Sequence, residues 1–433
     1  MGQSNSMCRS QCSQADFTGE LLETGPPLVI AAPGLAKMGQ DLAEKTGSED
    51  IASVDWDSFP SGDPNIRFRW QDVQGQHVVF LFDTVDRSRL FEQLALLQQL
   101  QGFPLPDADD SPRKWKTYAQ EGRYAWGRAH RITVVIPWYR PCQMERTSRW
   151  EAPEGVWTNS VPEGRWLDIP FAQSLAALLS APAPQPPGKG PALALDSRPL
   201  VPLWRPPVTL FFVELHEEDP VKSAIAPNSS VSVRTERFVP FFLTKFLERQ
   251  RSINLSQLFV LFPDHGAYER YFNSVKECLG LENENILYIN KTRVGDKIKQ
   301  EQKLFYQSSL GATSERAIFK RGQHVLIIDD FTNSGGTLFG AVALVRSLLK
   351  GEFGQALSEQ EQAEGLPVSI FVSHLVAAYK EETVKKIRQK LTDLGPQCRF
   401  YTTDSIPTTT NLLLDEPQAE VLPIADFLME YVR

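Results

Sequence analysis

The feature that most constrains the fold is a regular alternation of short apolar runs with amphipathic segments, which begins at Leu28 and continues to the last residues. Runs such as 77–82 and 131–136 are typical of buried strands, and residues 90–100 repeat apolar side chains at the spacing of a helix. Strands that alternate with helices predict an α/β fold with a mainly parallel sheet. The same rhythm occurs in both halves, so we expect two similar domains, each a mainly parallel sheet flanked by helices.

The composition of the segments between these elements predicts where the domains lie. Residues 1–26 lack periodicity and are expected to form a disordered tail. We expect an N-terminal domain over 27–236 and a C-terminal domain over 237–433. Two stretches of the N-terminal domain are expected to be insertions: 104–127, which is polar and rich in turn residues, and 181–207, which is rich in proline.

Composition also limits the class of protein. The chain has 433 residues and a net charge of −8, which excludes a broad basic surface for nucleic acid. Its five cysteines form no C-x-x-C pair and are odd in number, as expected of a reduced, cytoplasmic protein. No apolar run approaches the roughly 20 residues that span a bilayer.

The first residues carry a signal for membrane attachment. The sequence that begins Met1-Gly2 and has serine at position 6 fits the pattern for N-myristoylation of Gly2. Because one acyl chain binds membranes only weakly, palmitoylation of Cys8 or Cys12 would supply the second anchor. The alternative is a polar tail that matches a permissive pattern by chance.

The most informative motif for function lies at 325–337. Four apolar strand residues are followed by Asp329 and Asp330, and then by a loop with two glycines that opens a helix. Such a loop presents backbone N–H groups and a helix N-terminus to a phosphate, and its hydroxyls add donors. The acids, at the carboxyl end of a strand, suit a cation or the vicinal hydroxyls of a sugar. The alternative is an ordinary strand–turn–helix whose acids cap the helix.

This motif resembles the phosphoribosyl pyrophosphate-binding motif of type I phosphoribosyltransferases and of ribose-phosphate pyrophosphokinases. The rest of the chain, from about Leu28 to the last helix, is similar to the pyrophosphokinases, and most of all to a divergent branch well represented in plants. The further matching segments are Asp55-Trp56 with Phe59 and Gly62, 75–78, 91–94, Ile136-Pro137-Trp138 with Glu145-Arg146, Glu214-Leu215-His216, 262–267, 291–297, Ser373-His374 and 403–407.

The resemblance implies an enzyme that uses Mg²⁺ and ATP to convert ribose 5-phosphate into phosphoribosyl pyrophosphate and AMP. It implies active sites between subunits, and so a homo-oligomer or association with homologous subunits. The residues implied to bind ribose phosphate are Asp329, Asp330, Asn333, Ser334, Gly335, Gly336 and Thr337. The other implied site residues are Lys291 and Arg293 for catalysis, Phe59, Asp63, Glu145 and Arg146 for ATP, and His216, Asp264 and Glu214 for the metal.

Simpler interpretations of these residues remain open. His216 stands among acidic residues as a surface histidine would, and Asp264 follows a proline as a helix cap would. Lys291 and Arg293 would also suit a solvated loop, and the pair Glu145-Arg146 is common on surfaces. We expect the polar, poorly periodic run 291–323 to form a mobile lid that excludes water.

The departures from the family pattern fall on the ATP side. Pro60 and Ser61 stand where the family has an acid that helps to recognise adenine, and Glu214 replaces an aspartate. Three functions therefore remain open: an active pyrophosphokinase, a catalytically silent homologue with a regulatory or structural role, and a phosphoribosyltransferase. The matching N-terminal half argues against the third.

Overall fold

The structure is a computed structural model of the whole chain. The residues that it describes are 25–48, 51–52, 54–105, 125–142, 144, 150–151, 157–158, 169–181, 206–225, 230–250, 253–294, 297–308, 312–316, 319–349, 355 and 357–432. The acylation signal at Gly2, Cys8 and Cys12, and most of the two predicted insertions, lie outside these residues.

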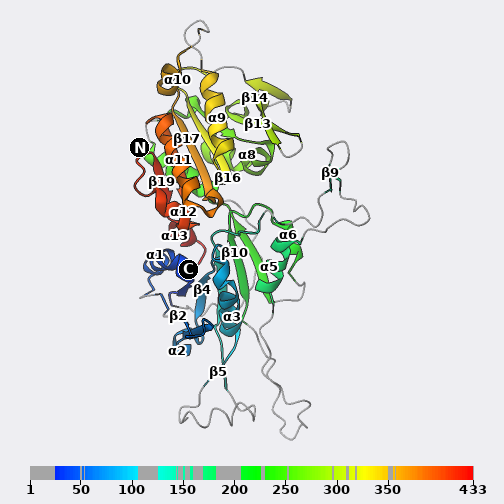
Figure 1. Ribbon diagram of the computed structural model, residues 1–433, viewed down its shortest axis with the longest axis vertical. Coiled ribbons are helices and arrows are strands. Elements are labelled where there is room, and N and C mark those ends of the chain that lie inside the picture. The colour runs from blue at the N-terminus through cyan, green and yellow to red at the C-terminus, as the bar shows by residue number, and fades with distance from the viewer. Residues whose placement is uncertain are drawn as a thin grey trace, which may run out of the picture.

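A five-stranded sheet forms the N-terminal part, in the lower half of Figure 1. All of its neighbouring strands are parallel, as the alternating pattern predicted. In sheet order the strands are β1 (Leu28–Ala31), β4 (His77–Leu81), β7 (Arg131–Ile136), β10 (Val208–Val213) and β11 (Val231–Glu236). The apolar residues of β4, β7 and β10 are all buried, as expected of strands covered on both faces, whereas those of the edge strand β11 are only partly buried.

An eight-stranded sheet forms the C-terminal part, in the upper half of Figure 1. The strands β13, β12, β16, β17, β18 and β19 are parallel to one another. The strands β14 and β15 extend the sheet beyond β13 as antiparallel neighbours. In sheet order the strands are β15 (Thr313–Arg316), β14 (Lys297–Gln307), β13 (Ile286–Val294), β12 (Leu258–Phe262), β16 (His324–Thr332), β17 (Val368–Leu375), β18 (Cys398–Thr403) and β19 (Ala419–Leu422).

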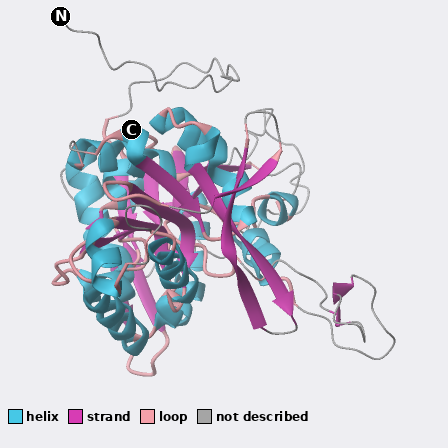
Figure 2. Ribbon diagram, turned by 90° about the horizontal axis from the view of Figure 1, so that it is seen from above, coloured by secondary structure: helices cyan, strands magenta, loops and turns pink. Residues whose placement is uncertain are grey.

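Helices cover both faces of the sheets (Figure 2). They are α1 (Ala36–Thr46), α2 (Trp70–Val73), α3 (Leu90–Gln101), α5 (Phe171–Leu179), α6 (Asp219–Ser223), α7 (Phe238–Arg249), α8 (His265–Leu279), α9 (Gly336–Ser347), α10 (Glu359–Gly365), α11 (Glu381–Leu394), α12 (Pro407–Thr410) and α13 (Ile424–Leu428). Three short antiparallel pairs complete the fold: β2 (Val54–Ser58) with β3 (Pro64–Phe68), β5 (Phe103–Leu105) with β6 (Ala125–Gly127), and β8 (Trp150–Glu151) with β9 (Trp157–Thr158).

The predicted order of strands and helices is confirmed for most of the chain, but one segment differs. The polar run 291–323, for which no strand was predicted, contains the end of β13 and the strands β14 and β15. The reason is pairing: β13 continues past its parallel partner and folds back on β14 as an antiparallel hairpin. Its polar residues gave no strand signal because a hairpin at a sheet edge needs no continuous apolar run.

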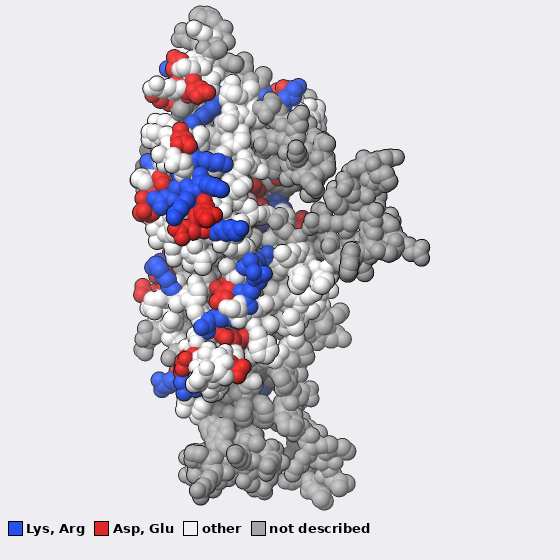
Figure 3. Space-filling model, in the orientation of Figure 1, with Lys and Arg blue, Asp and Glu red and all other residues white. Residues whose placement is uncertain are grey.

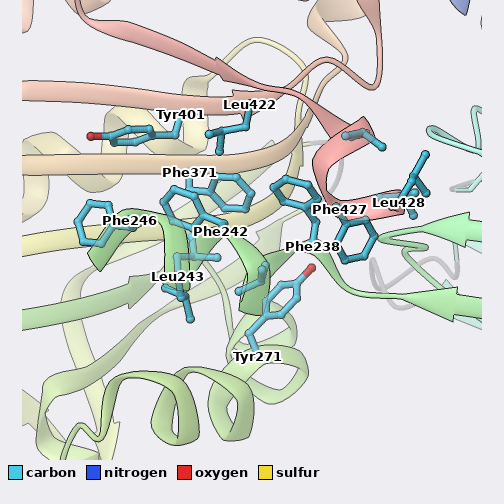
Figure 4. Packing of buried hydrophobic residues seen from close by; sticks show 14 of the residues in the cluster. Phe238, Phe242, Leu243, Phe246, Tyr271, Phe371, Tyr401, Leu422, Phe427 and Leu428 are labelled. Atoms are coloured by element: carbon cyan, nitrogen blue, oxygen red, sulfur yellow. The ribbon is translucent and has the colours of Figure 1, made fainter. Parts of the chain in front are cut away.

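A cluster of aromatic side chains joins the two parts of the molecule (Figure 4). Phe238, Phe242 and Phe246 recur every four residues on α7 and so share one face of the helix. The Phe242 ring stacks on Phe371 of β17, with ring centroids 3.8 Å apart. The same apolar core includes buried residues of both sheets, among them Val29. The packing of α7 therefore fixes the end of the first sheet relative to the second.

We propose that the domain boundary lies between β11, which ends at Glu236, and α7, which begins at Phe238.

No helix among the described residues is both long enough and apolar enough to cross a membrane. On the face shown in Figure 3, basic and acidic side chains are interspersed. Exposed ion pairs such as Lys385–Glu381, 2.8 Å apart, contribute little to stability because water screens their charges.

Asp404 predicts a pH-dependent contribution to stability. Its Oδ1 accepts a hydrogen bond of 2.7 Å from the backbone N–H of Ile424, at the start of α13. Burial, with a smaller effect of Asp41, raises the pKa of Asp404 to about 6, although Lys37 and the backbone hydrogen bond oppose the shift. A carboxyl whose pKa is higher in the folded state favours folding at low pH and loses this contribution as pH rises.

We therefore expect the free energy of unfolding of the wild type to fall relative to that of Asp404→Asn between about pH 4 and pH 6.5. Above this range the difference is constant. Urea denaturation of both proteins at a series of pH values measures it, and parallel stability profiles would show that Asp404 titrates as an ordinary carboxyl.

Candidate functional site

A cavity of about 510 Å³ lies where the C-terminal ends of β10 and β16 meet. One wall comes from residues just after β10, and the rest from the start of α8, the end of β16, and the loop that leads into the first residues of α9. The lining residues are His216, Glu217, Asp264, Gly266, Ala267, Arg270 and the unbroken run 329–337. The cavity thus contains all seven residues that the sequence predicted for ribose phosphate, together with His216 and Asp264.

The loop after β16 leaves the start of α9 open to this cavity. In the described part of the chain no side chain caps α9 from the N-cap position, so N–H groups of its first turn beyond that of Gly336 remain available to a ligand. The Thr332 hydroxyl accepts from the Gly335 N–H (3.2 Å), and the Ser334 hydroxyl accepts from the Gly336 N–H (3.3 Å), which hold the loop in shape. Uncapped N–H groups and the helix dipole together attract an anion.

Gly335 is required in this loop for two reasons. Its φ of +70° is in the left-handed region, which favours glycine. In addition, a Cβ at this position would lie 2.4 Å from Cε2 of Phe339, one turn into α9. Gly336 has neither constraint, because a Cβ there meets only the Ser334 hydroxyl, at 3.4 Å.

Asp330 is buried and binds a histidine and an arginine through one oxygen. Its Oδ2 accepts from Nδ1 of His216 and from Nη1 of Arg270, each at 2.5 Å. Burial works against the charged form of Asp330, but His216 and Arg270 outweigh it and hold the pKa of this carboxyl well below its usual range. Burial lowers and Asp330 raises the pKa of His216, and the net shift is upward. Asp330 is therefore ionised and fixed in orientation.

The other two predicted acids of the cavity differ in environment. Asp329 is partly exposed, and its Oδ1 accepts from the N–H of Asp330 at 3.1 Å. Asp264 caps α8, because its Oδ1 accepts from the N–H of Ala267 at 2.8 Å. The simpler interpretation of Asp264 as a helix cap is thus confirmed, and the cap also lines the cavity.

Glu214 does not line the cavity, although it was expected to bind a metal there. Its side chain is buried, and both carboxylate oxygens accept hydrogen bonds from the protein. The Glu214 side chain therefore binds the protein and not a ligand in the cavity. The prediction that it is a metal ligand is wrong.

The remaining predicted residues lie outside the cavity or outside the described residues. Lys291 and Arg293 are in β13, and their side chains are not among those that the structure describes. Phe59 and Asp63 are exposed in the turn between β2 and β3. Glu145-Arg146 lies outside the described residues.

Sequence reasoning missed Arg270. It lies on α8 at three- and four-residue steps after Ala267 and Gly266, on the helix face that lines the cavity. This spacing was the only signal in the sequence, because the partner of Arg270, Asp330, is 60 residues away.

Among the described residues, no three His, Cys, Asp or Glu side chains gather as a metal cluster would. The donors that line the cavity still suit Mg²⁺, which prefers oxygen ligands and is often held by one or two carboxylates together with substrate phosphates. Asp264 and Asp329 provide such carboxylates. His216 uses Nδ1 for Asp330, so Nε2 is the nitrogen that remains to bind a cation.

Comparison with known proteins shows similarity along nearly the whole chain, although no family model matches it. Ribose-phosphate pyrophosphokinase 3, chloroplastic, of Oryza sativa subsp. japonica is 23% identical over 407 residues, which are 92% of this chain and 74% of that protein. The protein of the same name in Arabidopsis thaliana is 24% identical over 395 residues, 89% of this chain and 71% of that protein. Ribose-phosphate pyrophosphokinase 4 of Oryza sativa subsp. japonica is 23% identical over 400 residues, 90% and 91% of the two chains.

The fold is similar to that of phosphoribosylpyrophosphate synthetase from Mycobacterium smegmatis, with a TM-score of 0.56 and 18% identity. The alignment covers 94% of this chain and 98% of that chain. The predicted fold class, two phosphoribosyltransferase-type α/β domains, is thereby confirmed. In sequence the chain is similar to the ribose-phosphate pyrophosphokinases of plants over about nine-tenths of its length, as its motifs indicated.

Proposed function

We propose that the chain is a ribose-phosphate diphosphokinase. In this reaction the anomeric hydroxyl of ribose 5-phosphate attacks the β-phosphorus of ATP. A bond forms between that oxygen and the β-phosphorus, the bond between the β-phosphorus and the oxygen that bridges to the α-phosphate breaks, and AMP leaves. The products are phosphoribosyl pyrophosphate and AMP.

One observation carries this proposal: an uncapped helix start and a pair of acids line the same cavity. The helix start suits a phosphate and the acids suit vicinal sugar hydroxyls, so the cavity offers partners for both parts of a ribose 5-phosphate molecule. In the proposed complex the N–H groups and hydroxyls of residues 333–337 bind the 5-phosphate. Asp329 and Asp330 accept hydrogen bonds from the ribose hydroxyls and orient the anomeric hydroxyl.

The charges around the cavity have separate roles in this proposal. Asp264 and Nε2 of His216, together with phosphate oxygens of the substrates, would hold Mg²⁺, which neutralises charge on the phosphates when bound. His216 and Arg270 keep Asp330 ionised, so that this carboxylate accepts hydrogen bonds from the sugar instead of donating a proton. Alignment of the sugar and neutralisation of charge are the main needs of phosphoryl transfer.

We propose that Lys291 and Arg293 close over the reacting phosphates. Tyr288 of β13 pairs with Phe262, the last residue of β12, directly before the turn that contains Asp264. Lys291 is three residues further along β13, so the backbone places it at the same edge of the sheet as the cavity. Lysine and arginine at this edge suit the charge that develops on the transferring phosphoryl oxygens.

The ATP side is proposed to involve a second subunit. Phe59 is 51% exposed at the turn between β2 and β3, where an aromatic ring can reach an adenine bound to another molecule. We therefore propose a homo-oligomer or association with homologous subunits. N-terminal acylation stays a prediction that the mass of the mature N-terminal peptide tests, and the cytoplasmic location stays a prediction as well.

The test of the proposed function is a coupled assay for AMP with Mg·ATP and ribose 5-phosphate. We expect AMP formation that depends on the sugar phosphate. Absence of AMP from well-folded protein that still binds ribose 5-phosphate would favour the silent homologue, which the altered ATP side permits. Consumption of phosphoribosyl pyrophosphate that depends on an added base would favour a phosphoribosyltransferase.

A further inference from the structure

Glu214, directly after β10, has an unusual backbone conformation. Its φ is +51°, in the left-handed region that residues other than glycine seldom adopt, and the residue is only 2% exposed. A buried glutamate in this conformation persists only when its surroundings fix it, and such strain is concentrated at functional sites. Glycine would adopt the same backbone without strain but would supply no carboxylate.

The carboxylate of Glu214 binds three separate elements of the C-terminal part. Oε2 accepts from the N–H groups of Phe238 (2.7 Å) and Val239 (3.2 Å), at the start of α7, and from the Ser373 hydroxyl on β17 (3.3 Å). Oε1 accepts from the Tyr271 hydroxyl on α8 at 2.8 Å. In Figure 4 this hydroxyl is directed toward Phe238. One buried side chain thus joins the end of β10 to α7, α8 and β17.

The backbone at Glu214 makes a further contact. Its carbonyl oxygen accepts from Nε2 of His374 at 3.3 Å, while Nδ1 of the same ring lies 2.9 Å from the Ser405 hydroxyl. Both the side chain and the carbonyl of residue 214 are therefore held by the second sheet. The two residues that follow it have little freedom to move.

Both partners of Asp330, His216 and Arg270, are neighbours of this network. His216 follows Glu214 by two residues, and Arg270 immediately precedes Tyr271, whose hydroxyl binds Glu214. His216 and Arg270 meet at the same oxygen of Asp330, each at 2.5 Å. The contacts form a closed ring. Glu214, two residues before His216, binds Tyr271, the residue after Arg270, and both His216 and Arg270 bind Asp330.

We infer that Glu214 is a positioning residue that sets the place of both His216 and Arg270, and through them the orientation of Asp330 in the sugar-phosphate cavity. The role of Asp330 in binding ribose 5-phosphate rests on the function proposed above, whereas the closed ring of contacts itself does not. Glu214 touches no substrate in this arrangement, since its oxygens are occupied by the protein and it does not line the cavity.

The test compares Glu214→Gly with Glu214→Gln. The glycine variant relieves the backbone strain and removes the carboxylate, so we expect a folded protein whose affinity for ribose 5-phosphate, measured by calorimetry, falls by about tenfold or more. Binding of inorganic phosphate should fall less, because the loop at Gly335 is intact. Glutamine keeps an oxygen that accepts from the start of α7, and should restore most of the affinity.

Two further measurements separate positioning from general stability. Ser358 caps α10 and is not among the lining residues, so Ser358→Ala should lower the melting temperature without weakening binding. The NMR side-chain signals of Arg270 should report a restrained guanidinium in the wild type and a mobile one in Glu214→Gly. This readout remains valid if the wild type binds no ribose 5-phosphate, which would contradict the proposed function alone.

A folded Glu214→Gly protein that binds ribose 5-phosphate as tightly as the wild type, or keeps the restrained Arg270 signals, would overturn the inference. So would equal losses of affinity in Glu214→Gly and Ser358→Ala.

Discussion

Replacement of Asp330 by asparagine is expected to destabilise the fold by about 3–5 kcal/mol, because it removes one partner of a buried ionic pair. The variant leaves the partly buried Arg270 without its carboxylate and gives His216 a neutral amide in place of a charged acceptor. It should also abolish detectable binding of ribose 5-phosphate, since the acid proposed to hold the sugar hydroxyls is lost. Urea denaturation at pH 7 measures the first effect, and calorimetry the second.

Asp329→Asn is the matched control for this experiment. Asp329 is the neighbouring acid of the same motif and is only partly buried, so solvent screens its charge. We expect weaker binding of the sugar phosphate but a clearly smaller loss of stability than for Asp330→Asn. Equal losses of stability in the two variants would contradict the inference that the contacts of Asp330 with His216 and Arg270 stabilise the fold.

Replacement of Gly335 by alanine is expected to destabilise the protein by about 2–4 kcal/mol and to weaken ribose 5-phosphate binding by about 100-fold or more. The methyl group would adopt an unfavourable φ of +70° and would lie 2.4 Å from the Phe339 ring, so the loop has to move. A shift of the loop misdirects the N–H groups at the start of α9. Thermal unfolding and calorimetry with ribose 5-phosphate measure the two effects.

Gly280→Ala separates backbone strain from displacement of the loop. Gly280 ends α8 with a φ of +61°, but a Cβ there has nothing within 4 Å. This variant should lose about 1 kcal/mol of stability and bind ribose 5-phosphate as the wild type does. Unaltered binding by Gly335→Ala would refute the assignment of this loop to a phosphate.

Local pattern was sufficient to predict the strand, the glycine-containing loop and the helix start at 325–337. The strand before the loop is an unbroken apolar run, and two glycines follow two acids within a few residues. Every part of that signal lies within thirteen residues, 325–337, so no distant contact was needed to recognise it. The two similar domains were predictable for a related reason, because strands buried on both faces read as continuous apolar runs.

The errors and omissions share a different cause. Arg270 and Glu214 owe their roles to partners far away in the sequence: Asp330 lies 60 residues from Arg270, and Ser373 lies 159 residues from Glu214. The hairpin of β13 and β14 owes its existence to pairing at a sheet edge and not to an apolar pattern. Nothing local distinguishes such residues from ordinary surface charges or polar loops.

The alternation of strands and helices, the two-domain α/β class and the loop at 325–337 follow from side chains that are neighbours along the chain. Contacts between distant segments are needed to show that Asp330 binds both His216 and Arg270, and that Glu214 does not line the cavity. These contacts depend on how α7 and α8 pack across the junction of two sheets. That packing is fixed by burial of apolar side chains from both halves, which a reading of either half does not reveal.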